Sequence, residues 1–185
     1  MCLSSLVQIV YGVLCLLGIA ATAVSLFTPD WQTFDLLNLD TLKKGQGLLP
    51  YTCVSTNPND YNGEECSNWY NSLPTTEKVV VACMCLAVLV EVVCFIYNIF
   101  SFCACCCKSC LLPILAVITV IVDILLAIAI IIYAIENKKF LPQEPLYRLA
   151  DSSLGWSFWI ACAALLINIA NTFVAGVASF CANNE

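Results

Sequence analysis

Residues 28–78 have the sequence TPDWQTFDLLNLDTLKKGQGLLPYTCVSTNPNDYNGEECSNWYNSLPTTEK, a polar stretch that separates two strongly apolar segments. Short apolar patches alternate in it with Asn, Asp, Gly and Pro, the residues typical of turns. Residues 33–36 and 51–54 have the character of strands, and Asn62-Gly63, between two cysteines, is a hairpin signal. We therefore expect this loop to fold as a small antiparallel β-sheet that the rest of the chain carries.

The composition around this loop is that of a membrane protein. The 185 residues are 61% hydrophobic and only 11% charged, with a mean hydropathy of +0.90, whereas soluble domains carry about 25% charged residues. A membrane-spanning helix needs roughly 20 mostly apolar residues. Four stretches meet this requirement: residues 6–27, 79–100, 111–135 and 156–180. The pattern therefore predicts one all-α bundle of four transmembrane helices, with loops at residues 28–78, 101–110 and 136–155.

Charge and residue types exclude several classes of function. The net charge of −6 argues against nucleic-acid binding, which requires a basic face. The chain has no His, which removes the usual general base and the commonest zinc ligand. It also contains no Walker loop, no G-x-G-x-x-G and no H-E-x-x-H. We therefore expect no enzyme, no catalytic residue, no metal ion, no small-molecule substrate and no cofactor beyond covalently attached palmitate.

Small residues and a short link indicate how the helices pack. Gly18 with Thr22, and Ala21 with Ser25, give small residues four apart, which lets helix backbones approach closely in lipid. The link at 101–110 is so short that the second and third spans are expected to be antiparallel neighbours.

The cysteines indicate the orientation. Cys53 and Cys66 lie in the hydrated first loop and would pair in an oxidising compartment. A second group lies at a membrane edge, where cytosolic cysteines are commonly palmitoylated: Cys103, Cys105, Cys106, Cys107 and Cys110. Both features fit a multi-pass plasma-membrane protein with cytosolic termini and both large loops outside.

The second cysteine group has two further interpretations. Cys107 and Cys110 form a C-x-x-C pair that could bind a metal, although the other spacings are too crowded for a tetrahedral set. Alternatively, the cysteines are unmodified small apolar residues at a helix end.

Two acidic residues lie inside the predicted spans. Glu91 and Asp123 are expected at about the same depth, because the second and third spans are antiparallel neighbours. A carboxylate in lipid costs at least about 2.5 kcal/mol, and no basic residue lies in any of the predicted spans. Each carboxyl is therefore either protonated or hydrogen-bonded to polar groups such as Gln8, Asn168 or Asn171. We interpret them as an interhelical hydrogen-bond clasp, and an ion or proton site is the alternative.

Several short motifs resemble one known family. Residues 27–32, FTPDWQ, followed by Gly-Leu at 47–48 and by Cys53 and Cys66, resemble the W…GLW…C…C signature of the claudin superfamily. Residues 155–158, GWSF, are similar to the start of the fourth span in peripheral myelin protein and stargazin relatives. The FTPxWQ opening is closer still to the Clc-like membrane proteins of nematodes, a branch of that superfamily.

The resemblance implies a fold and a set of residues. It implies one claudin-like domain over residues 1–185, in which the transmembrane four-helix bundle carries a small extracellular antiparallel β-sheet. The ectodomain motif would consist of Trp31, Gly47, Leu48 and Leu49, with Leu49 standing where the family usually has Trp. Trp31 would pack against the disulfide-linked hairpin and the outer membrane edge, and its simpler interpretation is an aromatic anchor at the membrane interface.

The resemblance also implies a function. It implies a role in cell–cell junctions and adhesion, in which the loops meet further copies in the same and the opposing membrane. The alternative is an auxiliary subunit that packs against an ion channel or receptor, as stargazin relatives do, and it predicts polar or small residues on the outer face of the third and fourth spans. A third hypothesis, an autonomous transporter, would use Glu91 and Asp123. The C-terminal residues lack the Tyr-Val ending of many claudins, so scaffold binding is not expected.

We expect a disulfide between Cys53 and Cys66, which closes a loop of about a dozen residues and stabilises it by roughly 3 kcal/mol. Mass spectrometry of the non-reduced protein should find the two peptides linked, and a membrane-impermeant thiol reagent should label both cysteines on intact cells after reduction. Unlinked thiols, or labelling only from the cytosol, would contradict the predicted architecture.

Overall fold

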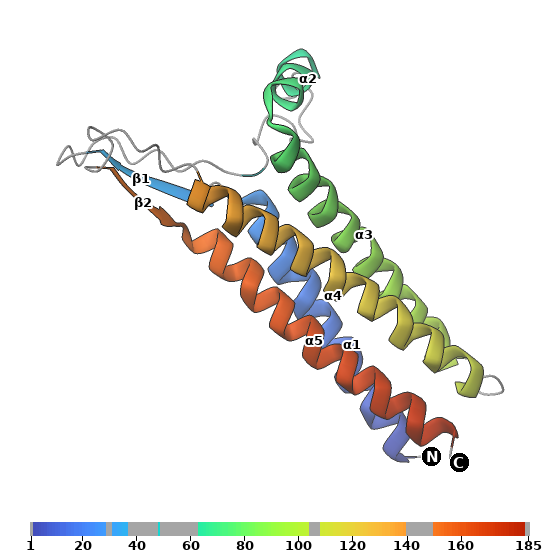
Figure 1. The fold of residues 1–185 in the computed structure, drawn as a ribbon. Coiled ribbons are helices and arrows are strands. Elements are labelled where there is room, and N and C mark those ends of the chain that lie inside the picture. Colours follow the sequence, from blue (N-terminus) through green and yellow to red (C-terminus); the bar gives the residue numbers. More distant parts are fainter. Residues whose placement is uncertain are drawn as a thin grey trace.

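The computed structural model describes residues 2–28, 31–36, 48, 63–103, 108–139 and 150–183. Four long helices in this part of the chain lie side by side as a bundle: α1 (Cys2–Phe27), α3 (Thr75–Cys103), α4 (Lys108–Lys139) and α5 (Trp156–Asn183). The two termini lie together at one end of the bundle, and a short helix, α2 (Gly63–Ser72), lies at the other end (Figure 1).

Each long helix contains a stretch that is long and apolar enough to cross a membrane. These stretches are Leu6–Phe27, Thr75–Ser101, Leu112–Glu136 and Trp156–Phe180. Large apolar side chains are exposed on the outer faces of all four helices, as expected where lipid is the solvent. The predicted bundle of four transmembrane helices is thereby confirmed, and the chain is a multi-pass membrane protein.

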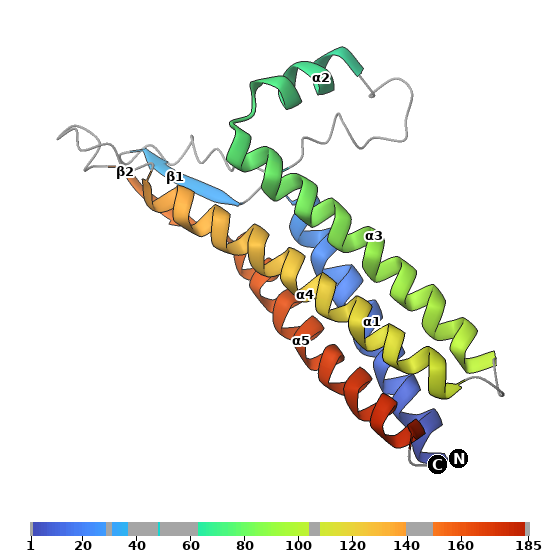
Figure 2. The same cartoon turned by 45° about the vertical axis from the view of Figure 1, so that its right-hand side comes forward.

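One pair of strands is present in the described residues. β1 (Gln32–Leu36) follows α1, β2 (Ala150–Leu154) precedes α5, and the two are antiparallel with Gln32 opposite Leu154. The pair lies at the end of the bundle opposite the termini (Figure 2). Residues 51–54, which the sequence predicts as a strand of the first loop, lie outside the described residues. The strand that does pair with β1 comes from the second loop, which the sequence did not indicate.

The hairpin predicted at Asn62-Gly63 is wrong. Gly63 is the first residue of α2, which continues to Ser72 and includes Cys66. The sequence of α2, GEECSNWYNS, contains no Val, Ile or Thr, the β-branched residues that favour strands. The helix ends before Pro74, because the residue that precedes a proline avoids the α-helical region.

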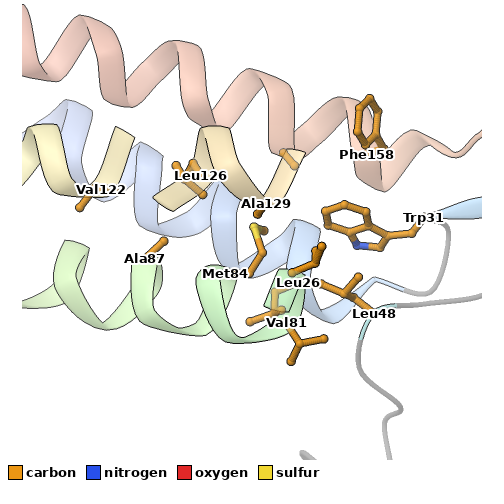
Figure 3. Close-up of a cluster of buried hydrophobic side chains, with 12 residues drawn as sticks. Leu26, Trp31, Leu48, Val81, Met84, Ala87, Val122, Leu126, Ala129 and Phe158 are labelled. Carbon is orange, nitrogen blue, oxygen red and sulfur yellow. The ribbon is translucent and has the colours of Figure 1, made fainter. Parts of the chain in front are cut away.

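Two clusters of buried side chains form the core of the bundle. The cluster near the loops includes Trp31, Met84 and Leu126 (Figure 3). The other cluster, nearer the termini, includes Tyr11 and Leu112. Alanine is frequent among the buried residues of both clusters, and such small side chains let helices pack closely where lipid removes most of the hydrophobic driving force.

Two glycines of α1 lie against side chains of neighbouring helices. A Cβ atom at Gly18 would lie 3.0 Å from Oδ1 of Asn168 on α5, and one at Gly12 would lie 3.1 Å from Nδ2 of Asn98 on α3. Because both neighbours are polar side chains inside the bundle, these glycines give amide groups access to the surface of α1. The structure thus places the amide side chain of Asn168 against Gly18, and the close approach of helix backbones expected there stays a prediction.

The variant Gly18→Leu is expected to lower the free energy of unfolding by about 1–3 kcal/mol, because it inserts a side chain where Asn168 already lies. The measurement is the shift of the unfolding midpoint in detergent micelles. Gly176→Leu on α5 is the matched control, since a Cβ atom there would meet nothing within 4 Å. An equal loss in both variants would mean that close packing does not require Gly18.

Candidate functional site

Trp31 is the residue that connects the helices at the loop end of the bundle. Its side chain is only 1% exposed, and its indole Nε1 donates a hydrogen bond of 2.6 Å to the carbonyl oxygen of Ser25. That carbonyl belongs to the last turn of α1, where backbone oxygens lack helical partners. The Trp31 ring also makes edge contacts with Tyr133 of α4 and Phe158 of α5, with ring centroids 4.8 and 6.2 Å away. Trp31 thus lies inside the bundle end, where three helices meet, and not at an aromatic membrane belt.

Leu48 is the second residue of the family-like motif that the structure describes. Its side chain is buried in the same cluster as Trp31 and lies near Leu26 and Val81 (Figure 3). Part of the first loop therefore folds back onto the end of the bundle. Gly47 and Leu49 lie outside the described residues, so their predicted roles stay predictions.

The start of α5 binds the end of α1 through polar contacts. Ser25 donates its hydroxyl to the backbone oxygen of Ser157 at 3.0 Å, and the hydroxyls of Thr28 and Ser157 are hydrogen-bonded to each other at 2.7 Å. The backbone N–H of Gly155 donates to the carbonyl oxygen of Trp31 at 2.9 Å. These bonds join residues 155–158 to the FTPDWQ segment, so the two motifs that are separate in the sequence form one structural unit.

The other cysteine and loop predictions fall largely outside this unit. Cys66 lies in α2 and is engaged in a disulfide. Cys53 lies outside the described residues, so the pairing of the two stays a prediction. Cys103 and Cys110 are residues of α3 and α4 at the end near the termini. The remaining cysteines of that group lie outside the described residues, and palmitoylation stays a prediction.

Glu91 is the centre of a polar contact between three helices inside the membrane. The residue is 2% exposed. Its Oε1 accepts hydrogen bonds from the Thr22 hydroxyl of α1 at 3.0 Å and from Nδ2 of Asn168 of α5 at 2.6 Å. Both donors are neutral groups, so these two hydrogen bonds to the Glu91 carboxyl need no basic residue. The arrangement is that of an interhelical clasp between α1, α3 and α5.

Asp123 has different partners and different surroundings. Its Oδ2 accepts a hydrogen bond of 2.7 Å from the Thr172 hydroxyl, which links α4 to α5. The residue is half-buried and lines a groove on the outer face of these two helices. Glu91 faces the bundle interior, whereas Asp123 borders the lipid-facing side. The structure therefore gives no geometric support to an ion site that both carboxyls share.

Three amide side chains were expected to hydrogen-bond these carboxyl groups, and Asn168 does so with Glu91. Gln8 and Asn171 are buried, and their amide atoms have no hydrogen-bond partner among the described residues. Thr22 and Thr172, which bind the two carboxyls, were not identified as their partners from the sequence. A hydroxyl group within a span was the signal that could have identified them, because a Thr side chain can donate a hydrogen bond to a carboxyl group there.

Within the residues that the structure describes, no group of three or more Cys, Asp or Glu could hold a metal ion.

A comparison with protein-family profiles matches residues 1–185 to the family described as tight junction protein, claudin-like. A search of curated proteins finds no match.

Replacing Glu91 is expected to separate the role of the oxygen from that of the charge. Glu91→Gln keeps the Oε1 acceptor and should change the free energy of unfolding by less than about 1 kcal/mol. Glu91→Leu leaves Thr22 and Asn168 with only the carbonyl oxygens of their own helices as acceptors. It removes both interhelical bonds and should cost about 1–3 kcal/mol.

The double variant Glu91→Leu, Asn168→Leu tests the coupling of the two residues. Its loss of stability should be smaller than the sum of the losses in the two single variants, because both polar partners are then removed together. The measurement is unfolding in detergent micelles, and strictly additive losses would show that the 2.6 Å contact does not contribute to stability.

Proposed function

The chain belongs to the claudin-like tight junction protein family, and on that premise we propose that it acts at cell–cell contacts. Its two large loops would meet further copies of the protein in the same and the opposing membrane. The helices would hold those loops at the membrane surface, and the protein would act by recognition and not by catalysis.

The observation that carries this proposal is the connection between the two loops at their roots. β1 of the first loop pairs with β2 of the second, and Gly155 donates its backbone N–H to Trp31. Buried Leu48 adds a further contact between the first loop and the bundle. A surface that is ordered before binding loses less conformational freedom on association. Joined loop roots therefore favour recognition between neighbouring molecules.

We propose that the loop end faces the outside of the cell and that the termini are cytosolic. Cys66, at the loop end, is engaged in a disulfide, which forms in an oxidising compartment. Cys103 and Cys110 lie at the opposite end of the bundle, beside the termini. This separation of the two cysteine groups supports a plasma-membrane location with outward loops.

One observation favours the auxiliary-subunit role as a second candidate. Asp123, Thr172 and Gly176 all line the groove on the outer face of α4 and α5. These are the polar and small residues that packing against a channel or receptor would require. The junctional role remains our first candidate, because the family is described as tight junction protein, claudin-like.

The junctional role predicts that the protein accumulates at contacts only where both touching cells express it. Cells that lack endogenous junctions would be transfected with a fluorescently tagged full chain and mixed with untransfected cells. Enrichment at contacts between two expressing cells, and its absence at mixed contacts, is the expected result. Equal fluorescence at both kinds of contact would reject the role.

Trp31→Phe tests the connection between loops and bundle. The variant keeps an aromatic ring but removes the N–H that binds the Ser25 carbonyl, so stability should fall by about 1–2 kcal/mol and contact enrichment should decrease at equal surface expression. Trp159→Phe is the matched control, because Trp159 is 63% exposed on the outer face of α5. Unchanged enrichment in Trp31→Phe would show that recognition does not need the anchored loop root.

A further inference from the structure

Buried polar atoms without hydrogen-bond partners are concentrated in one half of the bundle interior. Within the described part of the chain, eight buried side-chain oxygen or nitrogen atoms make no hydrogen bond, and seven of them belong to inward-facing residues of α1, α3 and α5. These residues are Gln8, Tyr11, Glu91, Asn98 and Asn171, and none is more than 5% exposed. Buried polar atoms in native proteins are nearly always hydrogen-bonded, so this concentration indicates that a further partner is bound there.

The inward faces of α1 and α3 are polar from the middle of the membrane to the end that carries the termini. Residues that follow each other at intervals of three or four lie on one face of a helix. The buried face of α1 consists there of Gln8, Tyr11, Cys15, Gly18 and Thr22. The buried face of α3 consists of Glu91, Cys94, Asn98 and Ser101.

Contacts between these faces bring the polar groups together. Nδ2 of Asn98 on α3 donates a long hydrogen bond of 3.5 Å to the backbone oxygen of Gln8 on α1. Tyr11 shares its buried cluster with Cys15, and Asn171 of α5 lies beside the Tyr11 side chain. The hydroxyl of Tyr11 still makes no hydrogen bond within the described residues. Three helices therefore contribute polar side chains to one region of the interior.

This region extends to the carboxyl group of Glu91. Thr22 and Asn168 both bind Oε1 of this carboxyl, whereas Oε2 is buried without a hydrogen-bond partner among the described residues. The thiol of Cys15 lies 3.6 Å from the backbone oxygen of Glu91. The second carboxyl oxygen is thus the innermost of the unpartnered atoms.

The polar region adjoins only one surface of the membrane. Gln8 and Asn98 lie within three residues of the ends of their spans on the side of the termini. Glu91 lies ten residues from the same end of its span, which is about 15 Å at the rise of an α-helix. Between Glu91 and the loops, the buried cluster is apolar and includes Met84 and Leu126. The loop half of the interior therefore separates the polar half from the opposite surface.

The unpartnered atoms identify the chemistry of the ligand. Glu91 Oε2 and Asn98 Oδ1 are acceptors, whereas the amides of Gln8 and Asn171 each lack partners for both the oxygen and the nitrogen. A metal cation binds oxygens but accepts no hydrogen bond from an N–H group, whereas water both donates and accepts. A buried water makes about three hydrogen bonds, so the seven atoms correspond to at least about two water molecules.

We propose that ordered water molecules occupy the bundle interior between Glu91 and the end that carries the termini. They bridge the side chains of Gln8, Tyr11, Asn98 and Asn171, and the innermost water donates a hydrogen bond to Oε2 of Glu91. Bridging waters provide hydrogen bonds nearly as favourable as direct ones. Glu91 is thus hydrated from the side of the termini and is separated from the loop side by the apolar cluster. This site lies inside the bundle and does not rest on the junctional role of the loops.

The test is X-ray radiolytic footprinting of the full-length protein in lipid nanodiscs. Radicals formed from a bound water oxidise the side chains beside it, and sulfur-containing side chains are readily oxidised. Cys15 and Cys94 are 2% and 1% exposed, and Met84, in the apolar cluster, is 0% exposed and serves as control. Both cysteines should be oxidised about tenfold faster than Met84, because water is bound only beside the cysteines. Mass spectrometry measures the rates, and an alcohol in the buffer removes radicals formed outside the protein.

A variant tests the polar groups that hold the water. Asn171→Leu replaces both polar atoms of the amide by methyl groups and should slow the oxidation of Cys94 and Tyr11 about threefold or more, because a bound water needs several polar partners. Leu126→Ile is the matched control, since it changes the shape of a buried side chain in the apolar cluster but not its size. It should leave both rates unchanged.

Three results would overturn the water site. Equal oxidation of Met84 and the two cysteines would mean that bulk solution reaches the whole interior. The absence of oxidation at Tyr11, Cys15 and Cys94 would mean that this half of the interior is dry. An equal loss in Asn171→Leu and Leu126→Ile would mean that packing, and not the amide, determines the rates.

A bound cation is distinguished by the composition of the buffer. Oxidation of Tyr11 should be the same in sodium and in choline, because water occupies the site in both. Oxidation that is present in choline and lost in sodium would identify a cation in place of water and would also overturn the proposal. None of these measurements depends on cell–cell contacts, so the water site and the junctional role are rejected or retained separately.

Discussion

The structure depends on how a bundle in lipid accommodates one carboxyl group in its interior. Lys78, the only basic residue within the four spans, lies at the loop end of α3, so neutral groups must satisfy Glu91. Thr22 and Asn168 do so from α1 and α5, and Gly18 leaves the room in which Asn168 reaches α1. Lipid solvates apolar surface about as well as protein does, and a polar contact therefore specifies which faces of these helices meet.

The same principle operates at the loop end with backbone groups. The last turn of α1 leaves carbonyl oxygens without helical partners, and the Trp31 indole binds the carbonyl of Ser25. Gly155 and Ser157 then connect the start of α5 to this segment. One buried tryptophan consequently helps to fix the position at which both loops leave the bundle, which links the packing of the helices to the geometry of the loop roots.

Glu91 and Asp123 illustrate how far the sequence could predict the candidate sites. Their presence within spans, the lack of basic partners and the need for neutral donors all followed from the residues themselves. Which amide serves Glu91 did not follow, since Asn168 and Asn171 are both buried on α5 and only Asn168 reaches it. That choice depends on the register between α1, α3 and α5. The prediction of a hairpin at Asn62-Gly63 failed for a different reason, because the residues that follow this turn signal in α2 include no Val, Ile or Thr to favour a second strand.

By itself, the sequence determined the four spans and the separation of the cysteines into two groups. The length and apolarity of a span are local properties, because every backbone group in lipid must be hydrogen-bonded within its own helix. Only the tertiary structure decided that β1 pairs with β2, since those strands are distant in the chain and meet only when the ends of α1 and α5 are side by side. It also decided that Glu91 faces inward and Asp123 outward. In a membrane both the interior and the surroundings of a helix are apolar, so the hydrophobic pattern that orients a helix in water carries little information there.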